Sequence, residues 1–492
     1  MDTRYSLKRP VQDLFVDQKD VELMHEMTIK VLKETGFAVD HKDALEVFRK
    51  AGAQIDGNIV KIDEKLVNQC LETVPRSFKV IGRGSIVGIG PEYEPAIATG
   101  YGPPFVLDHR TNEYRKGTLD DTVNLLKLIE TSDVITVSNL SVLDAEGLDM
   151  SLENTYTPQQ MLMLKYTTRP LCMGAIGLLN IKDKNKRLRD ALEENTRIIQ
   201  EFYGIGYDQV VSIQTVNGIS PLQINYDAAE NIFGAIQANQ AIQTAVLSLP
   251  NITSPASVMG TAVHDNIITL AEICLMQLIK PGTPVIRCSL TGATDMRFTA
   301  MTVGSPEVLL TAMCTLALGR YYGIPTRVCG SETDAYEPDY QAGAEAFQGL
   351  LPLYWGNADY EFHPAGILGA FNIISLEKFI LDEEIIRYHQ RIRNGITFSA
   401  EKSFAETMHK IGPRGNFLQM RTPKDYKKEY LLSNLMHKAG SNLKTRDEKG
   451  TLRENAIKKI DQRLAEYQVP ETTPEQMKFL NQYLPEGHKY NL

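Results

Sequence analysis

The feature that most constrains the fold is a strand-then-helix pattern that repeats from about residue 97 to residue 400. Short apolar, β-branched runs typical of strands fall at 104–108, 134–140, 171–176, 210–216, 244–249, 285–290, 326–329 and 360–363. Each is followed by a longer segment with helical periodicity, at 119–130, 158–166, 181–202, 225–240, 263–279, 306–321, 339–351 and 375–394. The sequence therefore predicts about eight consecutive βα units.

Eight βα units in succession favour one arrangement of the sheet. Strands that alternate with helices pair in parallel, with their faces covered by the helices. Eight such units predict closure into a (β/α)8 TIM barrel, which is an α/β fold. A doubly wound open sheet is the alternative, but no Gly-x-Gly-x-x-Gly follows the first predicted strand. A dinucleotide site of the Rossmann type therefore has no support.

The segments on either side of the barrel are predicted to be mainly helical. A chain of 492 residues exceeds the ~250–300 at which one core usually stops growing, so appended segments are expected. Residues 1–95 form an N-terminal helical segment packed on the barrel, and residues 96–400 form the barrel itself. Residues 401–492, which are rich in Lys and Glu, form a helical extension that wraps the barrel or contacts a partner.

Composition excludes several classes of function. The net charge of -9 and the pI near 5.6 disfavour nucleic-acid binding, which needs clustered Lys and Arg. Apolar runs fall short of the ~18 residues of a membrane span, and the first residues do not resemble a signal peptide. We therefore expect a cytoplasmic protein with no membrane partner.

Residues 329–366 have an unusual composition for a core. They combine acidic side chains, four tyrosines, the only tryptophan and a histidine with turn-forming Gly and Pro. Aromatic faces beside carboxylates attract an organic cation, because the ring quadrupole and the negative charge both favour it. A polar surface loop with incidental tyrosines explains the same composition, so both interpretations stay open at this point.

Catalytic residues of such barrels lie at the carboxyl ends of the strands. Taken in order, the candidates there are Tyr101, Asp108, Asn139, Ser141, Gly174, Gln214, Asn217, Asn251, Thr291, Asp295, residues 331–336 and His363. Several are amides and hydroxyls, and the titratable members include no obvious pair of nucleophile and base. This pattern disfavours hydrolytic chemistry of the serine or cysteine type.

The six cysteines show no Cys-x-x-Cys spacing, which argues against a disulfide framework or a zinc knuckle. Cys172, Cys288 and Cys329 fall in three different predicted strands, as ligands of a barrel zinc site would. Inward and outward side chains alternate along a strand, so spacing alone does not bring the three together. We assign no metal site, and metal analysis of the purified protein tests that assignment.

Several motifs resemble a known family. The run Gly-Ser-Glu-Thr-Asp-Ala at 330–335, followed by Pro-Asp-Tyr-Gln-Ala-Gly-Ala-Glu at 338–345, resembles the signature of the trimethylamine methyltransferase superfamily. Residues 376–384 look like the helix that follows this signature. Segments 34–40, 49–56 and 108–120 are also similar, so the resemblance spans nearly the whole chain.

The resemblance implies a (β/α)8 barrel that transfers a methyl group from an amine to the Co(I) centre of a separate corrinoid protein. Founding members carry pyrrolysine near the position of Tyr336, whereas this chain has standard residues throughout. It is therefore similar to the non-pyrrolysine branch, which demethylates quaternary amines such as glycine betaine, proline betaine, carnitine or γ-butyrobetaine. The corrinoid is expected on the partner protein, with no cofactor bound tightly here, and self-association is left open.

The chemistry of a quaternary amine agrees with this branch. Its nitrogen is already fully positive, so the leaving group is a neutral tertiary amine that needs no proton. The protein then has to orient the reacting atoms, held about 3–3.5 Å apart, and it needs no general acid.

The resemblance and the residue types together give a predicted site. Asp108, Glu332 and His363 are the predicted catalytic group, in which the carboxylates, with Asp334, face the ammonium. His363, with Asn139 and Gln214 behind it, is expected to donate to a substrate carboxylate. Phe371, between small neighbours, is also a candidate for a movable gate. The aromatic wall around the cation is expected to include Tyr101, Tyr336, Tyr340, Tyr354, Trp355, Phe362 and Phe371.

Two other classes of function remain as alternatives. One is a zinc-dependent methyltransferase with a thiol acceptor, which metal content would reveal. The other is a non-catalytic betaine-binding protein, which would bind the amine and leave its methyl groups in place.

Overall fold

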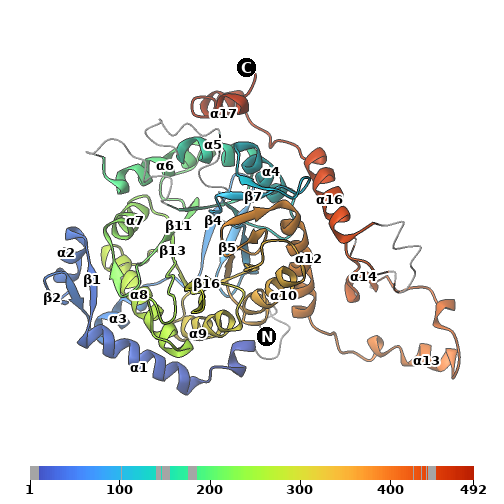
Figure 1. Cartoon of the computed structure of the whole chain (residues 1–492), viewed down its shortest axis with the longest axis horizontal. Coiled ribbons are helices and arrows are strands. Elements are labelled where there is room, and N and C mark those ends of the chain that lie inside the picture. Colours follow the sequence, from blue (N-terminus) through green and yellow to red (C-terminus); the bar gives the residue numbers. More distant parts are fainter. Residues whose placement is uncertain are drawn as a thin grey trace.

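An eight-stranded parallel sheet closes on itself at the centre of the molecule, as Figure 1 shows for the computed structural model of the chain. Each strand lies beside those that precede and follow it in the barrel, and the last pairs with the first. A parallel bridge between Ala98 and Val137 joins the first strand to the second and completes the circle. The eight barrel strands are β6 (Ala96–Ala98), β9 (Ser138–Asn139), β10 (Leu171–Gly174), β11 (Ser212–Val216), β13 (Ala241–Thr244), β14 (Val285–Cys288), β17 (Thr326–Cys329) and β18 (Tyr360–Phe362). The predicted (β/α)8 fold is confirmed.

The structure describes residues 10–100, 102–139, 146, 156–174, 186–424, 426–433, 435–438, 440 and 450–492. Helices ring the barrel where the periodicity predicts them. They are α4 (Leu119–Glu130), α5 (Tyr156–Tyr166), α6 (Leu188–Tyr203), α7 (Tyr226–Gln237), α8 (Val258–Ile279), α9 (Pro306–Tyr322), α10 (Tyr340–Gly349), α11 (Leu351–Trp355) and α12 (Leu376–Arg393). Side chains cap several of them, as where Ser375 accepts from the amide of Lys378 at the start of α12.

Helix α8 is mostly apolar and is buried over most of its length. By length and hydropathy it is the one helix among the described residues that could cross a membrane, yet 89% of its most apolar window is buried inside the protein. A helix that is hydrophobic all round belongs in a core. We therefore interpret α8 as a core helix, against which α1 (Gln18–Glu34) and α3 (Glu64–Leu71) pack.

The N-terminal segment is attached to the barrel by strand pairing. Its strand β1 (Phe37–Val39) pairs with β3 (Ile59–Lys61) and, on the other side, with β12 (Gln223–Ile224) from the connection after β11. The segment also holds η1 (Val11–Leu14), α2 (Lys42–Lys50) and β2 (Gln54–Asp56).

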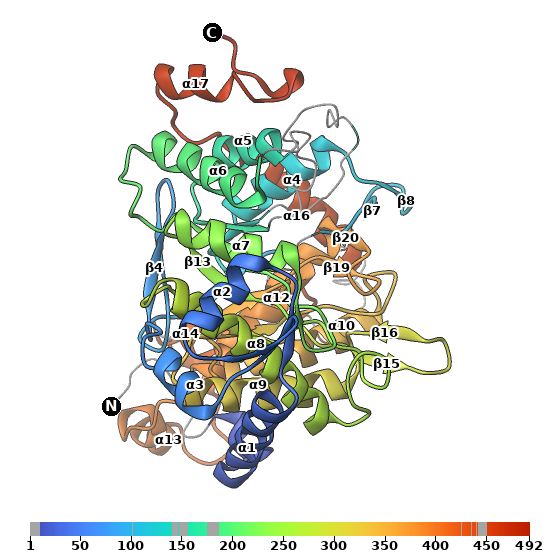
Figure 2. The same cartoon turned by 90° about the vertical axis from the view of Figure 1, so that its left-hand side faces the viewer.

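A hairpin closes the amino end of the barrel. It consists of β4 (Phe78–Ile81) and β5 (Ile86–Ile89), and the amide of Ile81 donates to the carbonyl of Val210, just before β11, at 2.8 Å. Its side chains Val80 and Ile89 are fully buried against barrel residues. Figure 2 shows this hairpin on the side opposite to the projecting hairpin β15 (Ala293–Asp295) and β16 (Ala300–Thr302), which follows β14 at the carboxyl end.

Two predicted strands are corrected. The 104–108 run is not the first barrel strand: it forms β7 (Phe105–Leu107) of a separate sheet with β8 (Tyr114–Lys116), β19 (Ile367–Leu368) and β20 (Ile373–Ser375). The true first strand, β6, is an alanine-rich tripeptide with little β-propensity. The fifth strand, β13, ends at Thr244 where the prediction began, because the apolar run after it lines a pocket rather than a sheet.

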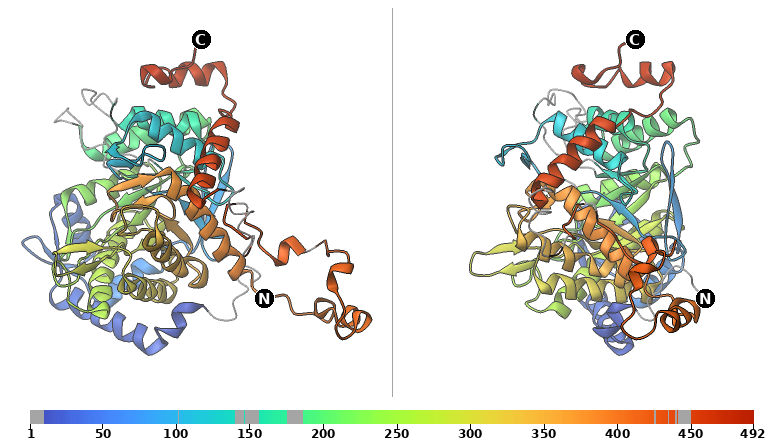
Figure 3. Two further views of the ribbon diagram at one scale, coloured as in Figure 1. Left: turned by 45° about the vertical axis from the view of Figure 1, so that its right-hand side comes forward. Right: turned by 90° about the vertical axis from the view of Figure 1, so that its right-hand side faces the viewer.

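The C-terminal extension has two parts. Helix α16 (Leu452–Glu466) packs on α12 and α4, where Arg463 donates to Glu383 at 2.7 Å, and α17 (Pro474–Leu480) and η5 (Glu486–His488) follow. Before it, η3 (Glu401–Ser403), α13 (Ala405–Ile411) and η4 (Phe417–Gln419) project away from the barrel, and α14 (Tyr426–Glu429) leads back to it (Figure 3).

Candidate active site

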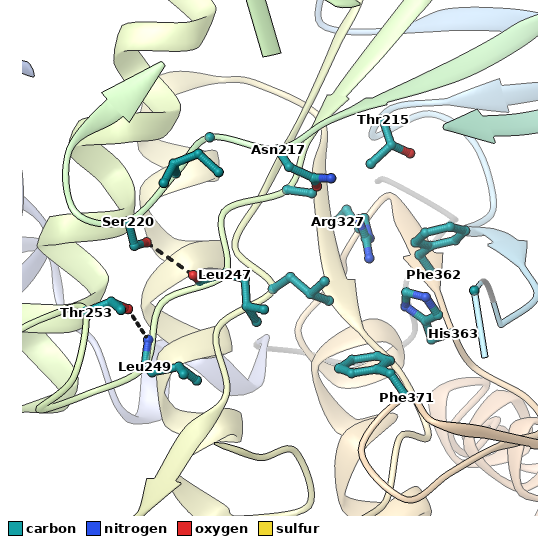
Figure 4. A pocket seen from close by; sticks show the side chains of 15 residues that line it. Thr215, Asn217, Ser220, Leu247, Leu249, Thr253, Arg327, Phe362, His363 and Phe371 are labelled. Carbon is teal, nitrogen blue, oxygen red and sulfur yellow. Dashed lines mark hydrogen bonds between the residues drawn. The ribbon is translucent and has the colours of Figure 1, made fainter. Parts of the chain in front are cut away.

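A cavity of about 520 Å³ opens at the carboxyl ends of β11, β13, β14, β17 and β18. This is the end of a (β/α)8 barrel where catalytic sites lie, and the volume falls in the range of small-molecule pockets. Most of the wall is apolar, with a small number of polar groups (Figure 4). The lining residues are Gly102, Thr215, Asn217, Gly218, Ile219, Ser220, Ala245, Leu247, Leu249, Thr253, Leu290, Arg327, Phe362, His363 and Phe371.

Arg327 supplies a buried cation to this pocket. Its side chain leaves β17 and is 0% exposed, and its Nη1 donates to Oε1 of Gln243 at 3.3 Å. Its Nε and Nη2 find no hydrogen-bond partner among the described residues. Its guanidinium carbon lies 4.3 Å from the centre of the Phe362 ring. Nε and Nη2 form one edge of the guanidinium, the edge with which arginine binds a carboxylate in a bidentate manner.

His363 stands beside Arg327 in a strained backbone conformation. Its φ is +75°, a value that costs a non-glycine residue of order 1–3 kcal/mol and that clusters at functional sites. Its ring lies between Phe362 and Phe371, at 4.2 and 5.0 Å between ring centres. Its Nδ1 is 3.5 Å from Oε1 of Glu332, and both side chains are buried. The two atoms are near each other but make no hydrogen bond with each other in the described structure.

A second carboxyl lies in the barrel wall behind these residues. Glu361 is 0% exposed, and neither of its side-chain oxygens has a hydrogen-bond partner in the described part of the chain. Burial raises its pKa well above the ordinary value, the nearby Glu332 raises it further, and Arg327 lowers it. Burial therefore disfavours the charged form of this carboxyl, which is the form that would compensate the charge of Arg327.

Phe371 covers one side of the cavity from a loop with left-handed backbone. Ala370 and Phe371 have φ of +48° and +73°. The amides of Gly369 and Ala370 donate to the carbonyls of Ala335 and Thr333, at 2.9 and 3.0 Å. The loop that carries Phe371 is therefore tied to the Gly-Ser-Glu-Thr-Asp-Ala motif, and its predicted role as a gate stays a prediction.

The three barrel cysteines, Cys172, Cys288 and Cys329, lie in environments that favour the thiol over the thiolate. Burial raises the pKa of Cys172, that of Cys288 to about 11, and that of Cys329 well above its usual value. Thiolates rather than thiols bind zinc, and the absence of a metal site stays a prediction that metal analysis of the purified protein tests. Across the part of the chain that the structure describes, no three His, Cys, Asp or Glu side chains gather as metal ligands would.

The structure brings together only some of the predicted site residues. Phe362, His363 and Phe371 line the cavity, and Glu332 contacts His363. Tyr101 lies outside the described residues. Asp108 lies in the turn between β7 and β8, paired with Arg115 at 3.1 Å, because the strand before it belongs to the side sheet.

The remaining predicted residues serve other contacts. Asn139 donates to the carbonyl of Thr99 at 3.4 Å, and Gln214 to the hydroxyl of Ser212 at 2.8 Å. Asp334 accepts from the amides of Val303 and Gly304 at 2.9 and 3.1 Å.

The predicted aromatic wall also lies mostly elsewhere. Tyr336 and Tyr340 are 69% and 92% exposed on the rim. Tyr354 and Trp355 pack near His389, outside the barrel. Aromatic composition located the right segment of the chain, but composition does not say which side of it faces the cavity.

The sequence analysis missed Arg327, Thr215 and the apolar residues after β13, and it named Asn217 as a strand-end candidate without giving it a role. One signal was present, because Arg327 is a charged residue inside an otherwise apolar strand. A buried charge needs a partner. A charged residue in an apolar strand can therefore indicate a site where a ligand of opposite charge binds.

Known proteins of one family match this chain along nearly its whole length. The family model for trimethylamine methyltransferase (MTTB) matches residues 5–488. The chain is 41% identical over 488 residues to proline betaine:corrinoid methyltransferase of Eubacterium limosum, covering 98% of this chain and 100% of that protein. It is 36% identical to the L-carnitine:corrinoid methyltransferase of the same organism, over 99% and 100% of the two chains. Glycine betaine methyltransferase of Desulfitobacterium hafniense is 31% identical, over 93% and 94%.

Among solved structures, monomethylamine methyltransferase of Methanosarcina barkeri is similar with a TM-score of 0.48 and 12% identity, covering 94% of this chain and 96% of that one. The fold assignment rests on the strand order of the barrel itself.

Proposed function

This chain belongs to the trimethylamine methyltransferase family, and from that premise we propose that it demethylates a quaternary amine of the betaine class in the cytoplasm. The methyl group goes to the Co(I) centre of a corrinoid carried by a partner protein. Three similar proteins are named for proline betaine, carnitine and glycine betaine, all of which combine a quaternary ammonium with a carboxylate.

The observation that carries this proposal is the unpartnered edge of Arg327 within the cavity. A buried guanidinium without an anion is costly, and a carboxylate that accepts from Nε and Nη2 removes that cost. Burial raises the pKa of Glu361, which disfavours the charged carboxylate that would compete with the substrate for Arg327. His363 lines the same cavity, with Glu332 3.5 Å from its Nδ1.

The other end of such a substrate suits the rest of the wall. Methyl groups of a quaternary ammonium cannot form ordinary hydrogen bonds, and they pack against apolar and aromatic surface. Phe362, Phe371, Leu247 and Leu290 provide that surface. None of the lining residues that the structure describes is an Asp or Glu. This suits the reaction, because the positive charge on nitrogen disappears as the C–N bond breaks, and a tight anionic cage would stabilise the ground state most.

The residues of this chain then act by holding the substrate in place. The Co(I) centre supplies the electron pair that forms the Co–C bond, while the electrons of the C–N bond stay on nitrogen. The product amine leaves neutral, so no group of the protein has to give or take a proton. Arg327 fixes the carboxylate end, and Phe371 with the leucines excludes water from the methyl end.

A substrate panel tests this proposal. The purified protein is given Co(I) corrinoid on its partner and, in turn, proline betaine, carnitine, glycine betaine, γ-butyrobetaine and trimethylamine. We expect methyl-cobalt absorbance and a stoichiometric tertiary amine with at least one betaine and none with trimethylamine. Binding without loss of a methyl group would support the betaine-binding alternative instead.

Variants of Arg327 test its role in binding the substrate carboxylate. Removing one partner of a buried, hydrogen-bonded charge pair costs about 3–5 kcal/mol, so Arg327→Met should lower kcat/KM by roughly 10²-fold or more. Arg327→Lys should recover little, because lysine lacks the bidentate edge. Arg197→Met on the outer face of α6 is the matched control, since Arg197 is exposed.

A further inference from the structure

A segment of the C-terminal extension leaves the body of the protein without packing on it. This segment, residues 396–424, is called the arm below. All its residues are described, and none of them is buried. Figures 1 and 3 show α13, at its centre, well away from the barrel.

The arm exposes an unusual amount of apolar surface. Ile396, Phe398 and Leu418 are 72%, 82% and 92% exposed, and four further large apolar side chains are between 44% and 56% exposed. With ~150–250 Å² on an aromatic side chain, the seven expose on the order of 800 Å². One partner in a stable protein interface contributes about that area, and soluble monomers rarely leave such a surface open.

The base of the arm is held in a fixed position. Arg391 donates from Nε to the carbonyl of Glu429 and from Nη1 to that of Gly395, both at 2.8 Å. Lys402 pairs with the Glu429 carboxylate at 2.8 Å. The two ends of the arm are thus joined where it leaves the body, so its apolar residues are presented in a preformed direction.

We propose that the arm packs on a second copy of this chain. The surface that covers the exposed apolar residues of the arm has to be present whenever the chain is folded. A second copy of the same chain is always present, and most soluble oligomers are built from identical copies. The partner corrinoid protein does not meet this condition, because methyl transfer requires it at the mouth of the barrel. Figure 2 shows α13 on the side of β4 and β5, opposite the β15–β16 hairpin beside the mouth.

The charges of the chain indicate where the arm binds. The arm holds five Lys and Arg against two Glu, a net +3 in a chain whose net charge is -9. Residues 11–34, which form η1 and α1, hold six Asp and Glu against three Lys, a net -3. Leu14, Phe15 and Leu23 in this segment are 67%, 53% and 43% exposed. Opposite charge around exposed apolar residues makes η1–α1 of the second copy the receiving surface.

The molar mass in solution tests the proposal. Sedimentation equilibrium of the full chain should give a multiple of 55.1 kDa. The double variant Phe398→Asp/Leu418→Asp should shift it to the single mass, and the milder Leu418→Ser should weaken association at least tenfold. Phe298→Asp is the matched control, because Phe298 is 75% exposed on the β15–β16 hairpin, and it should leave the mass unchanged. A wild-type protein of single mass, or a folded double variant that still associates, overturns the proposal.

Cross-linking tests the receiving surface. A 1:1 mixture of ¹⁴N- and ¹⁵N-labelled protein is treated with a zero-length carbodiimide. Mixed-isotope peptides should join the arm lysines, such as Lys410, to carboxylates of residues 11–34. Mixed-isotope links to another region would overturn the assignment to η1–α1. Links found only within one copy, or only to added corrinoid protein, would overturn the second copy as the occupant.

Discussion

Two arginines inside the barrel strands show how position decides the role of a residue. Arg287 and Arg327 are both fully buried. Arg287 donates to the carbonyl of Thr315 at 2.7 Å and to Oδ1 of Asn266 at 3.0 Å, so its charge is held by the helices outside the strands. Arg327 lines the cavity with one edge unpartnered. Only the second is placed to receive a ligand.

His363 should be needed for activity and not for folding. His363→Ala removes a donor beside a charged ligand, worth about 1.5–3 kcal/mol, so kcat/KM for a betaine should fall roughly 10- to 150-fold. His363→Asn keeps a residue that tolerates positive φ and should preserve the melting temperature. Glu332→Gln, which acts only through the imidazole, should have a smaller effect. An unchanged kcat/KM for the betaine in His363→Ala would remove this histidine from the site.

Glu361 should make the folded protein sensitive to high pH. Its pKa is raised by burial, so between the ordinary value and the raised one the folded state holds a proton that the unfolded chain releases. The free energy of unfolding then falls as pH rises through that window, by about 1.4 kcal/mol per pH unit.

Thermal unfolding of Glu361→Gln between pH 4.5 and 8 checks this point. The variant carries no ionisable group there, so its melting temperature should exceed that of the wild type by a margin that grows with pH. Glu475→Gln, at an exposed position of α17, should show no such trend. A constant difference across the range would mean that Glu361 is ionised in the folded state.

At the residue scale, the sequence indicated the side of the cavity that holds His363, Phe362 and Phe371 but not the side that holds Arg327. Phe362 and His363 were named because they stand in the last predicted strand within a segment of unusual composition, and Phe371 because it is an aromatic residue between small neighbours. Arg327 was not predicted. Its strand, Thr-Arg-Val-Cys, resembles the strand of Arg287, Val-Ile-Arg-Cys, and only the structure shows which of the two arginines faces the cavity. Asp108 and Asn139 were predicted in the site, but they do not line the cavity. Polar residues at predicted strand ends also form turns, as Asp108 does, or bond to the neighbouring strand, as Asn139 does.

At the scale of elements, the junction after β17 depends on close approach of the backbone. A Cβ on Gly330 would lie 2.4 Å from Oε1 of Glu361 and 2.6 Å from the Cα of Pro364. This glycine therefore sets the spacing between the ends of β17 and β18, which carry Arg327 and His363.

Gly330→Ala should accordingly damage both stability and activity. Overpacking of this kind costs about 1–3 kcal/mol, and a displacement of the β18 end should lower kcat/KM beyond what the lost stability explains. Gly343→Ala is the control, since nothing lies within 4 Å of its Cβ and alanine favours helix α10 by about 1 kcal/mol. Denaturation midpoints and initial rates of the two variants make the comparison. Equal behaviour of both would show that the junction has room to adjust.

Helices were easier to predict than strands, for a physical reason. The helical periods of α4, α9 and α12 extend over several turns and agree with the structure within a residue or two. The strands β6, β9 and β18 are two or three residues long, too short to show a period. The first barrel strand was misplaced because its Ala-Ile-Ala sequence is weaker than the Phe-Val-Leu of β7 nearby.

At the scale of the whole molecule, the two ends of the barrel have separate tasks. The mouth holds the cavity and must admit a partner, whereas the opposite side carries the plug of β4 and β5, and α13 lies towards it (Figure 2). Association through the arm therefore leaves the mouth open. Sequence periodicity predicted that residues 401–492 are helical, but only the arrangement in space shows that part of them packs on nothing in their own chain.

The most direct test of the central claim is single-turnover methylation of Co(I) corrinoid by a betaine and by its methyl ester. The ester keeps the quaternary ammonium and loses the carboxylate charge. If Arg327 anchors that carboxylate, the wild type should methylate cobalt at least 10²-fold faster with the betaine, and Arg327→Met should nearly abolish the difference. Equal rates with both compounds in the wild type, or no methyl-cobalt with any betaine, would contradict the account.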